Sequence, residues 1–310
     1  MKKKPTVELS VIATVYNDCE IVPLLVNEII KNIEPLKVEY EIILVNDSSE
    51  DKSDEFIRNE CSKNPKIKGI TLNRNFGQQI AMSAGIRHAN GNYILIMDGD
   101  LQNPPEAIPE LLYEIKKGFD IVYTVSKKRN NIIDSATSGL FWFVLIKVFR
   151  VVIIKDQLML KIFSKGFVDK YNLYNEINRT VDGLAIDISA NYNIIEVQNR
   201  KRVIGKSHYN FSRRFNLMID MVINLTDSPI NFMIHIGWIT FASTVILSLI
   251  RIYMLIFEDI TPGFTSLILS ICFFGSLTVL LLGIIGRYLS NINIEVKNRP
   301  LYHIKKTYNL

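Results

Sequence analysis

The chain has 310 residues, of which 48% are hydrophobic and 22% charged, and this balance excludes a disordered or low-complexity protein. Its three cysteines, Cys19, Cys61 and Cys272, are too few and too scattered for a disulfide framework or a cysteine metal cluster. Lys and Arg outnumber Asp and Glu by only 36 to 31, so we expect no nucleic-acid partner and look for places where basic residues gather.

The first part of the chain alternates short β-branched runs with amphipathic segments. The expected strands are Leu9 to Val15, Tyr40 to Val45, Ile67 to Leu72, Tyr93 to Met97 and Asp120 to Val125. The expected helices are Ile21 to Asn32, Asp51 to Asn64, Gln78 to His88 and Pro105 to Lys117. Repeated βα units predict an α/β fold with a mainly parallel sheet, in which ligands bind beyond the carboxyl ends of the strands.

The loop after the fourth expected strand is the strongest candidate for a metal site. Asp98 and Asp100 stand there on either side of a glycine, with Gln102 as a third source of oxygen. Hard cations such as Mg²⁺ or Mn²⁺ are held by few protein oxygens and are completed by phosphates and water. Taken alone, the same spacing also fits an ordinary turn.

Two further loops carry polar groups at the same expected edge. Asp47 follows the second strand, where its carboxylate can accept N–H groups of a nucleotide base or cap the next helix. Residues 73–78 follow the third strand and place Arg74 and Gly77 before a helix. This arrangement suits an anion, although a charged surface loop explains it equally well.

The C-terminal third carries two long apolar runs. Residues 264–286 contain no charge and are long enough to cross a bilayer, and residues 231–252 are similar except for His235 and for Arg251 near the end of the run. Two buried helices of a soluble core are the alternative. Basic residues flank the pair on both outer sides, so the positive-inside rule predicts a hairpin in the cytoplasmic membrane with both termini in the cytoplasm. Small residues within the second run also suit a homo-oligomer: Gly275, Ser276, Gly283 and Gly286.

These patterns predict four regions. Residues 1–210 form a cytoplasmic domain, and 229–290 hold two transmembrane helices, at about 231–252 and 264–286. Between them, 211–228 form an amphipathic helix that lies either in the membrane interface or against the domain. Residues 291–310 form a basic cytoplasmic tail.

The order of the motifs resembles a known family. Residues 11–17 (VIATVYN), 45–49 (VNDSS), 74–77 (RNFG) and 97–105 (MDGDLQNPP) resemble the successive motifs of family 2 glycosyltransferases with the GT-A fold. The two apolar runs and the ending after Gly286 are similar to bacterial polyisoprenyl-phosphate glycosyltransferases, including undecaprenyl-phosphate glucosyltransferases. The resemblance implies inverting transfer of a hexose from a nucleotide sugar, by preference a UDP-sugar, to polyprenyl phosphate in cell-envelope or O-antigen synthesis.

The resemblance also implies roles for individual residues. Tyr16, Asp47 and Asp98 would bind the nucleotide, and Asp98, Asp100 and Gln102 would hold Mg²⁺ or Mn²⁺. Asp156, matched to the first aspartate of an Asp-Ala-Gly-Asp-Phe-Arg-like segment, would act as the base or orient the acceptor, so the catalytic set is Asp156, Asp98 and Asp100. Lys161 replaces the arginine of that segment, and with Arg202 and Lys206 it would contact the acceptor phosphate.

Other interpretations stay open. The second aspartate and the glycine of the Asp156–Lys161 segment are replaced, and Arg202 and Lys206 also fit a basic strip drawn to anionic lipid. The acceptor can therefore be a lipid-linked glycan instead of a lipid phosphate. A catalytically silent membrane partner of another transferase is the third hypothesis.

Overall fold

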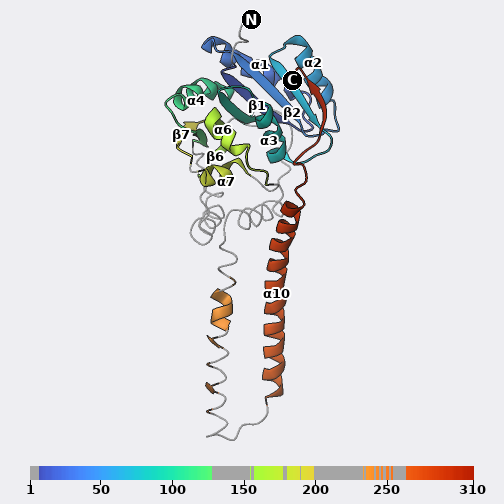
Figure 1. Ribbon diagram of the computed structural model, residues 1–310, viewed down its shortest axis with the longest axis vertical. Helices are drawn as coiled ribbons and strands as arrows, with labels where there is room; N and C mark the ends of the chain where they lie inside the picture. The colour runs from blue at the N-terminus through green and yellow to red at the C-terminus, as the bar shows by residue number, and fades with distance from the viewer. Residues whose placement is uncertain are drawn as a thin grey trace. The chain divides into compact units, whose positions relative to one another are not determined.

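The structure is a computed structural model that describes residues 7–127, 154, 157–176, 180–188, 190–198 and 263–310, and scattered helical positions between 233 and 253. It divides into two compact units (Figure 1). One is built on a β-sheet and includes Pro300–Leu310, whereas the other includes the long C-terminal helix.

The first unit is built on an eight-stranded sheet with the order β7-β5-β6-β4-β1-β2-β3-β8. Its strands are β1 (Leu9–Val15), β2 (Tyr40–Asn46), β3 (Ile67–Leu72), β4 (Tyr93–Asp98), β5 (Ile121–Ser126), β6 (Gln157–Ser164), β7 (Tyr192–Val197) and β8 (Ile304–Tyr308). Strands β3, β2, β1 and β4 run parallel, as does β7 with β5, while β6 and β8 are antiparallel to their neighbours. The mainly parallel sheet expected from the sequence is thereby confirmed.

Helices cover both faces of the sheet. They are α1 (Ile21–Ile33), α2 (Ser53–Lys63), α3 (Gln78–His88), α4 (Ile108–Ile115), α6 (Lys165–Tyr171) and α7 (Val181–Asp187), with short 3₁₀ turns at Glu34–Leu36 and Pro105–Ala107. Successive residues of β1 face opposite layers, so Val11 packs with α1, α2 and α4, and Ile12 packs with α3, α6 and α7. Burial on both faces explains why β1 and β2 are apolar almost throughout.

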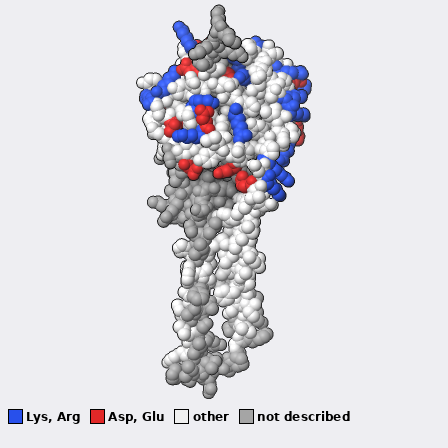
Figure 2. Space-filling model, in the orientation of Figure 1, with Lys and Arg blue, Asp and Glu red and all other residues white. Residues whose placement is uncertain are grey.

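The second unit contains the long apolar helix α10 (Phe264–Val296). Its segment Phe273–Val296 is the one stretch among the described residues that is long and apolar enough to cross a membrane. Figure 2 shows an uncharged surface over most of its length. The other expected span, 231–252, is described only at scattered positions, and the amphipathic segment 211–228 lies outside the described residues.

The end of the chain differs from the basic tail predicted for residues 291–310. Helix α10 continues to Val296, and Ile304–Tyr308 then pairs with β3 as an edge strand of the sheet. Charge alone misses this strand because Lys305 and Lys306 are adjacent basic residues on an exposed strand, and lysine is common on the edge strands of sheets.

Candidate active site

The candidate residues gather at one edge of the sheet because β1, β2 and β4 are parallel neighbours. Val15 pairs with Asn46 and Thr14 pairs with Asp98, so the loops that follow these strands start side by side. Such an edge is where doubly wound sheets bind their ligands.

The loops after β1 and β2 are bonded to each other. Asn17 N donates to Ser49 Oγ at 3.0 Å, and Glu50 N donates to Asn17 Oδ1 at 2.8 Å. These bonds hold the backbone next to Tyr16, a residue that is 46% exposed. Tyr16 is therefore an accessible aromatic residue beside the β2 loop, as a base-stacking residue needs.

Asp47 does not cap α2, which removes one of the two interpretations of its position. Its Oδ1 accepts from Phe76 N and its Oδ2 from Gly77 N, both at 2.8 Å. Burial raises the pKa of Asp47, and these two hydrogen bonds offset part of that rise. The carboxylate thus fastens the loop 73–77 to β2, a role that the sequence does not reveal. In that loop the Arg74 guanidinium stacks on the Phe76 ring at 4.4 Å.

Asp98 is held by two amide side chains at the end of β4. Its Oδ1 accepts from Gln78 Nε2 and its Oδ2 from Asn103 Nδ2. Burial and the nearby charge of Asp100 raise the pKa of Asp98 to about 6, although the two amides and Lys161 act in the opposite direction. Two carboxylates that repel each other in a buried place favour a bound cation.

The backbone around Asp100 is tightly constrained. A Cβ on Gly99 would lie 2.3 Å from Thr14 O, so only glycine lets β4 turn this close to β1. Leu101 then takes φ 58°, a left-handed conformation rare for leucine, while its side chain is buried. Gln102 N donates to Asp100 Oδ1 at 3.1 Å, so the observed contact of Gln102 is through its backbone.

This chemistry fits a divalent cation that the substrate helps to hold. Among the described residues, no group of three or more His, Cys, Asp or Glu side chains forms a complete metal site. Asp98 and Asp100 offer hard carboxylate oxygens and leave the remaining positions to phosphate and water, as Mg²⁺ and Mn²⁺ sites commonly do.

Lys161 lies on β6, opposite Ile96 of β4 and close to the acidic pair. Its Nζ is 2.6 Å from Asp182 Oδ1 and 5.4 Å from the centre of the Tyr123 ring. Gln157 Nε2 donates to the same Asp182 oxygen at 2.9 Å. The structure therefore places the charge of Lys161 beside the site but pairs it with a carboxylate of α7.

Three supporting residues escape sequence reasoning. Asn103 bonds both Asp98 and Leu160 N, Gln78 bonds Asp98, and Asp182 pairs with Lys161. Their partners lie up to 57 residues away in the chain, so local patterns carry no signal for them. The predicted residues Asp156, Arg202 and Lys206 lie outside the described residues.

Comparison with known proteins identifies the family of the chain. Residues 10–170 match the model of the family described as Glycosyl transferase family 2. The chain is 33% identical to an undecaprenyl-phosphate 4-deoxy-4-formamido-L-arabinose transferase of Photorhabdus laumondii, over 96% of this chain and 94% of the relative. It is 30% identical to the uncharacterized glycosyltransferase YkcC of Bacillus subtilis (98% and 95%) and 28% identical to the bactoprenol glucosyl transferase of Shigella phage SfII (97% and 98%).

Solved structures share the fold at low identity. A mannosyltransferase from Pyrobaculum calidifontis, in complex with GDP-Man and Mn²⁺, superposes with a TM-score of 0.51 at 15% identity, over 72% of this chain and 67% of the other. Mannosyl-3-phosphoglycerate synthase from Rubrobacter xylanophilus gives 0.53 at 13% identity, over 74% and 75%. These similarities confirm the GT-A type of α/β fold.

Proposed function

Because this chain belongs to glycosyl transferase family 2, we propose that it moves a hexose from a nucleotide sugar to polyprenyl phosphate with inversion at the anomeric carbon. The observation that carries the proposal is the shared anchoring of Asp47 and Asp98. Gly77 N binds Asp47 and the next residue, Gln78, binds Asp98, so one loop joins the two acidic positions of the site.

On the donor side, we assign the base to Tyr16 and Asp47 and the diphosphate to the edge near Asp98. The loop 73–77 leads into the amino end of α3, a place that favours phosphate. Asp98, Asp100 and Gln102 would hold Mg²⁺ or Mn²⁺, which supplies positive charge for the diphosphate that leaves. Asp98 is kept in place for this by Gln78 and Asn103.

On the acceptor side, a phosphate oxygen of the lipid attacks the anomeric carbon as the bond from that carbon to the nucleoside diphosphate breaks. The nucleophile is already anionic, so this chain's residues mainly orient it and need not remove a proton from it. We assign orientation of the acceptor to Asp156 and contact with its phosphate to Lys161, Arg202 and Lys206. Support for Lys161 is its buried positive charge close to Asp98.

The acceptor proposed here is a membrane lipid, which requires the site to work at a bilayer. The apolar helix α10 supports an anchor, and the relatives named for undecaprenyl phosphate and bactoprenol support the lipid class. We propose that α10 and residues 231–252 form the two transmembrane helices, with the sheet unit in the cytoplasm because basic residues flank both runs on that side.

The test is transfer in vitro. Membranes with the full chain are incubated with undecaprenyl phosphate, Mn²⁺ and a panel of radiolabelled UDP- and GDP-sugars, with Asp100→Ala membranes as the control. A labelled lipid that the control does not make supports the proposal. Label found only on a preformed lipid-linked glycan would show that the glycan, and not polyprenyl phosphate, is the acceptor. No labelled product from any donor would favour a catalytically silent partner of another transferase.

A further inference from the structure

The C-terminal segment, residues 300–310, is built into the sheet unit next to the donor site. We propose that this segment positions the loop 73–77 and so forms part of the nucleotide site, although it is the far end of the chain. The positioning stands on contacts within the sheet unit, and only its effect on donor binding rests on the proposed function.

The pairing of β8 with β3 extends into the loop itself. Thr71 lies opposite Lys306 and Leu72 lies opposite Ile304, so a bulge at this point shifts the register by one residue. Beyond the end of the ladder, Asn73 N donates to His303 O at 3.0 Å. The first residue of the loop 73–77 is therefore bonded to the C-terminal segment.

The sheet has a prepared place for the segment on the α2 face. Tyr308 packs against the core, and its Cδ2 would lie 2.7 Å from a Cβ on Gly69, so any larger residue there would collide with the ring. Asp54 of α2 accepts hydrogen bonds from Lys306 Nζ at 2.9 Å and from the Tyr308 hydroxyl at 3.1 Å. The same carboxylate also binds Thr71 of β3.

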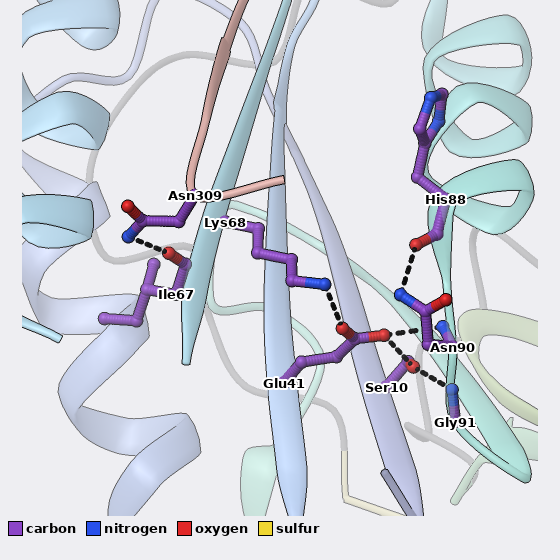
Figure 3. A network of polar contacts seen from close by, with 8 residues as sticks. All are labelled: Ser10, Glu41, Ile67, Lys68, His88, Asn90, Gly91 and Asn309. Atoms are coloured by element: carbon purple, nitrogen blue, oxygen red, sulfur yellow. Dashed lines mark hydrogen bonds and ion pairs between the residues drawn. The ribbon is translucent and has the colours of Figure 1, made fainter. Parts of the chain in front are cut away.

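Further contacts hold both ends of the segment. Asn309 Nδ2 donates to Cys61 O at 2.6 Å and to Ile67 O at 2.9 Å, and Figure 3 shows the second of these bonds. Near its start, Leu301 is buried, and Tyr302 packs on the same hydrophobic cluster as Phe76 of the loop. The segment thus reaches both layers that surround β3.

Two separate anchors therefore hold the loop 73–77. The C-terminal segment binds its first residue, while Asp47 binds Phe76 N and Gly77 N at its end. A short loop fixed at both ends has little conformational entropy left to lose when a ligand binds, so releasing one anchor weakens binding. Release should also let its amide groups exchange with solvent more readily.

Hydrogen exchange on the full chain tests the positioning. Lys306→Ala combined with Tyr308→Ala removes the bonds to Asp54 and the ring over Gly69, whereas Lys305→Ala changes the neighbouring exposed lysine as a control. We expect the double variant to exchange about tenfold faster at residues 73–77 than the control, with β1 and β4 unchanged. Unchanged exchange at 73–77 would overturn the inference.

A second variant covers the case in which the double variant does not fold. Asn309→Ala removes only the two bonds to Cys61 O and Ile67 O, and a smaller rise in exchange at 73–77 is expected. In transfer assays both variants should raise the donor KM several-fold and change kcat less. Faster exchange with an unchanged donor KM would refute the role of the segment in the nucleotide site. A wild-type protein without transferase activity would refute the proposed function alone and leave the positioning of the loop 73–77 intact.

Discussion

Lys161 and Asp182 form an ion pair of 2.6 Å in which the two partners differ greatly in exposure. The lysine side chain is 1% exposed, whereas the aspartate side chain is 43% exposed. A charge buried in protein depends on its partner, while an exposed charge can be solvated by water. Asp182 therefore serves mainly to keep the positively charged side chain of Lys161 inside the sheet unit, next to the acidic site.

This asymmetry predicts unequal effects of the two single substitutions. Asp182→Asn leaves the buried Lys161 without its counter-charge and should cost about 3 kcal/mol, the low end of the range because Asp182 is partly exposed. Lys161→Met leaves an aspartate that water can reach and should cost less. Thermal unfolding of the purified full chain measures both, and an Asp182→Asn protein as stable as Lys161→Met would contradict the argument.

Asp100 is expected to be essential for transfer and unimportant for folding. Asp100→Ala removes one of two neighbouring carboxylates that repel each other in a buried turn after β4, so it should lower kcat by about a hundredfold or more while membrane insertion stays unchanged. Removal of divalent cations with EDTA should have a comparable effect that Mn²⁺ reverses. The surface substitution Glu55→Ala on α2 is the control, and equal turnover by Asp100→Ala and this control would exclude the metal role.

Asp47 is expected to affect donor binding through the loop 73–77. Asp47→Ala removes the side-chain acceptor of Phe76 N and one of the two acceptors of Gly77 N, which also donates to Asn75 Oδ1, at a cost of about 1–3 kcal/mol, so we expect a donor KM at least about tenfold higher. Asp47→Asn keeps one carbonyl oxygen as an acceptor, so its donor KM should lie between those of the wild type and Asp47→Ala. If Asp47→Asn and Asp47→Ala were equally impaired, the anchoring of the loop 73–77 would not explain the effect of Asp47 on donor binding.

Glu41 is expected to make the stability of the sheet unit depend on pH. It forms an ion pair with Lys68 at 2.6 Å and accepts from Ser10 Oγ and Asn90 N, as Figure 3 shows. Burial alone would raise the pKa of Glu41, but hydrogen bonds from Lys68, Ser10 and Asn90 outweigh it and lower the pKa below its ordinary 4.5.

A carboxyl group whose pKa is lower in the folded than in the unfolded protein stabilises the folded state at pH values above its unfolded-state pKa. This stabilisation is lost as the pH falls through the folded-state pKa. Unfolding of the wild type should therefore become easier below about pH 4.5. Glu41→Gln should be less stable than the wild type at pH 7, and its stability should change less as the pH falls below about 4.5. Parallel pH curves for the two proteins would rule out this role.

Local sequence patterns were sufficient for the parallel core of the sheet. The short β-branched run in β1 and the amphipathic run in α1 reflect burial that each segment experiences by itself, so their bounds follow closely from the sequence. The place of Asp98 and Asp100 after an apolar strand was visible for the same reason. Strand β8 could not be predicted from local patterns, because its place depends on Gly69, Asp54 and Asn73, more than 200 residues earlier in the chain.

The sequence by itself determined the βα order, the apolar helix α10 and the identity of the acidic residues at the strand ends. Only the tertiary structure decided that Asp47 anchors the loop 73–77, that Asp182 compensates Lys161 and that residues 300–310 close the β3 edge. The reason is physical: periodicity records which face of a segment is buried, whereas hydrogen-bond partners are set by how distant segments meet once the chain has folded.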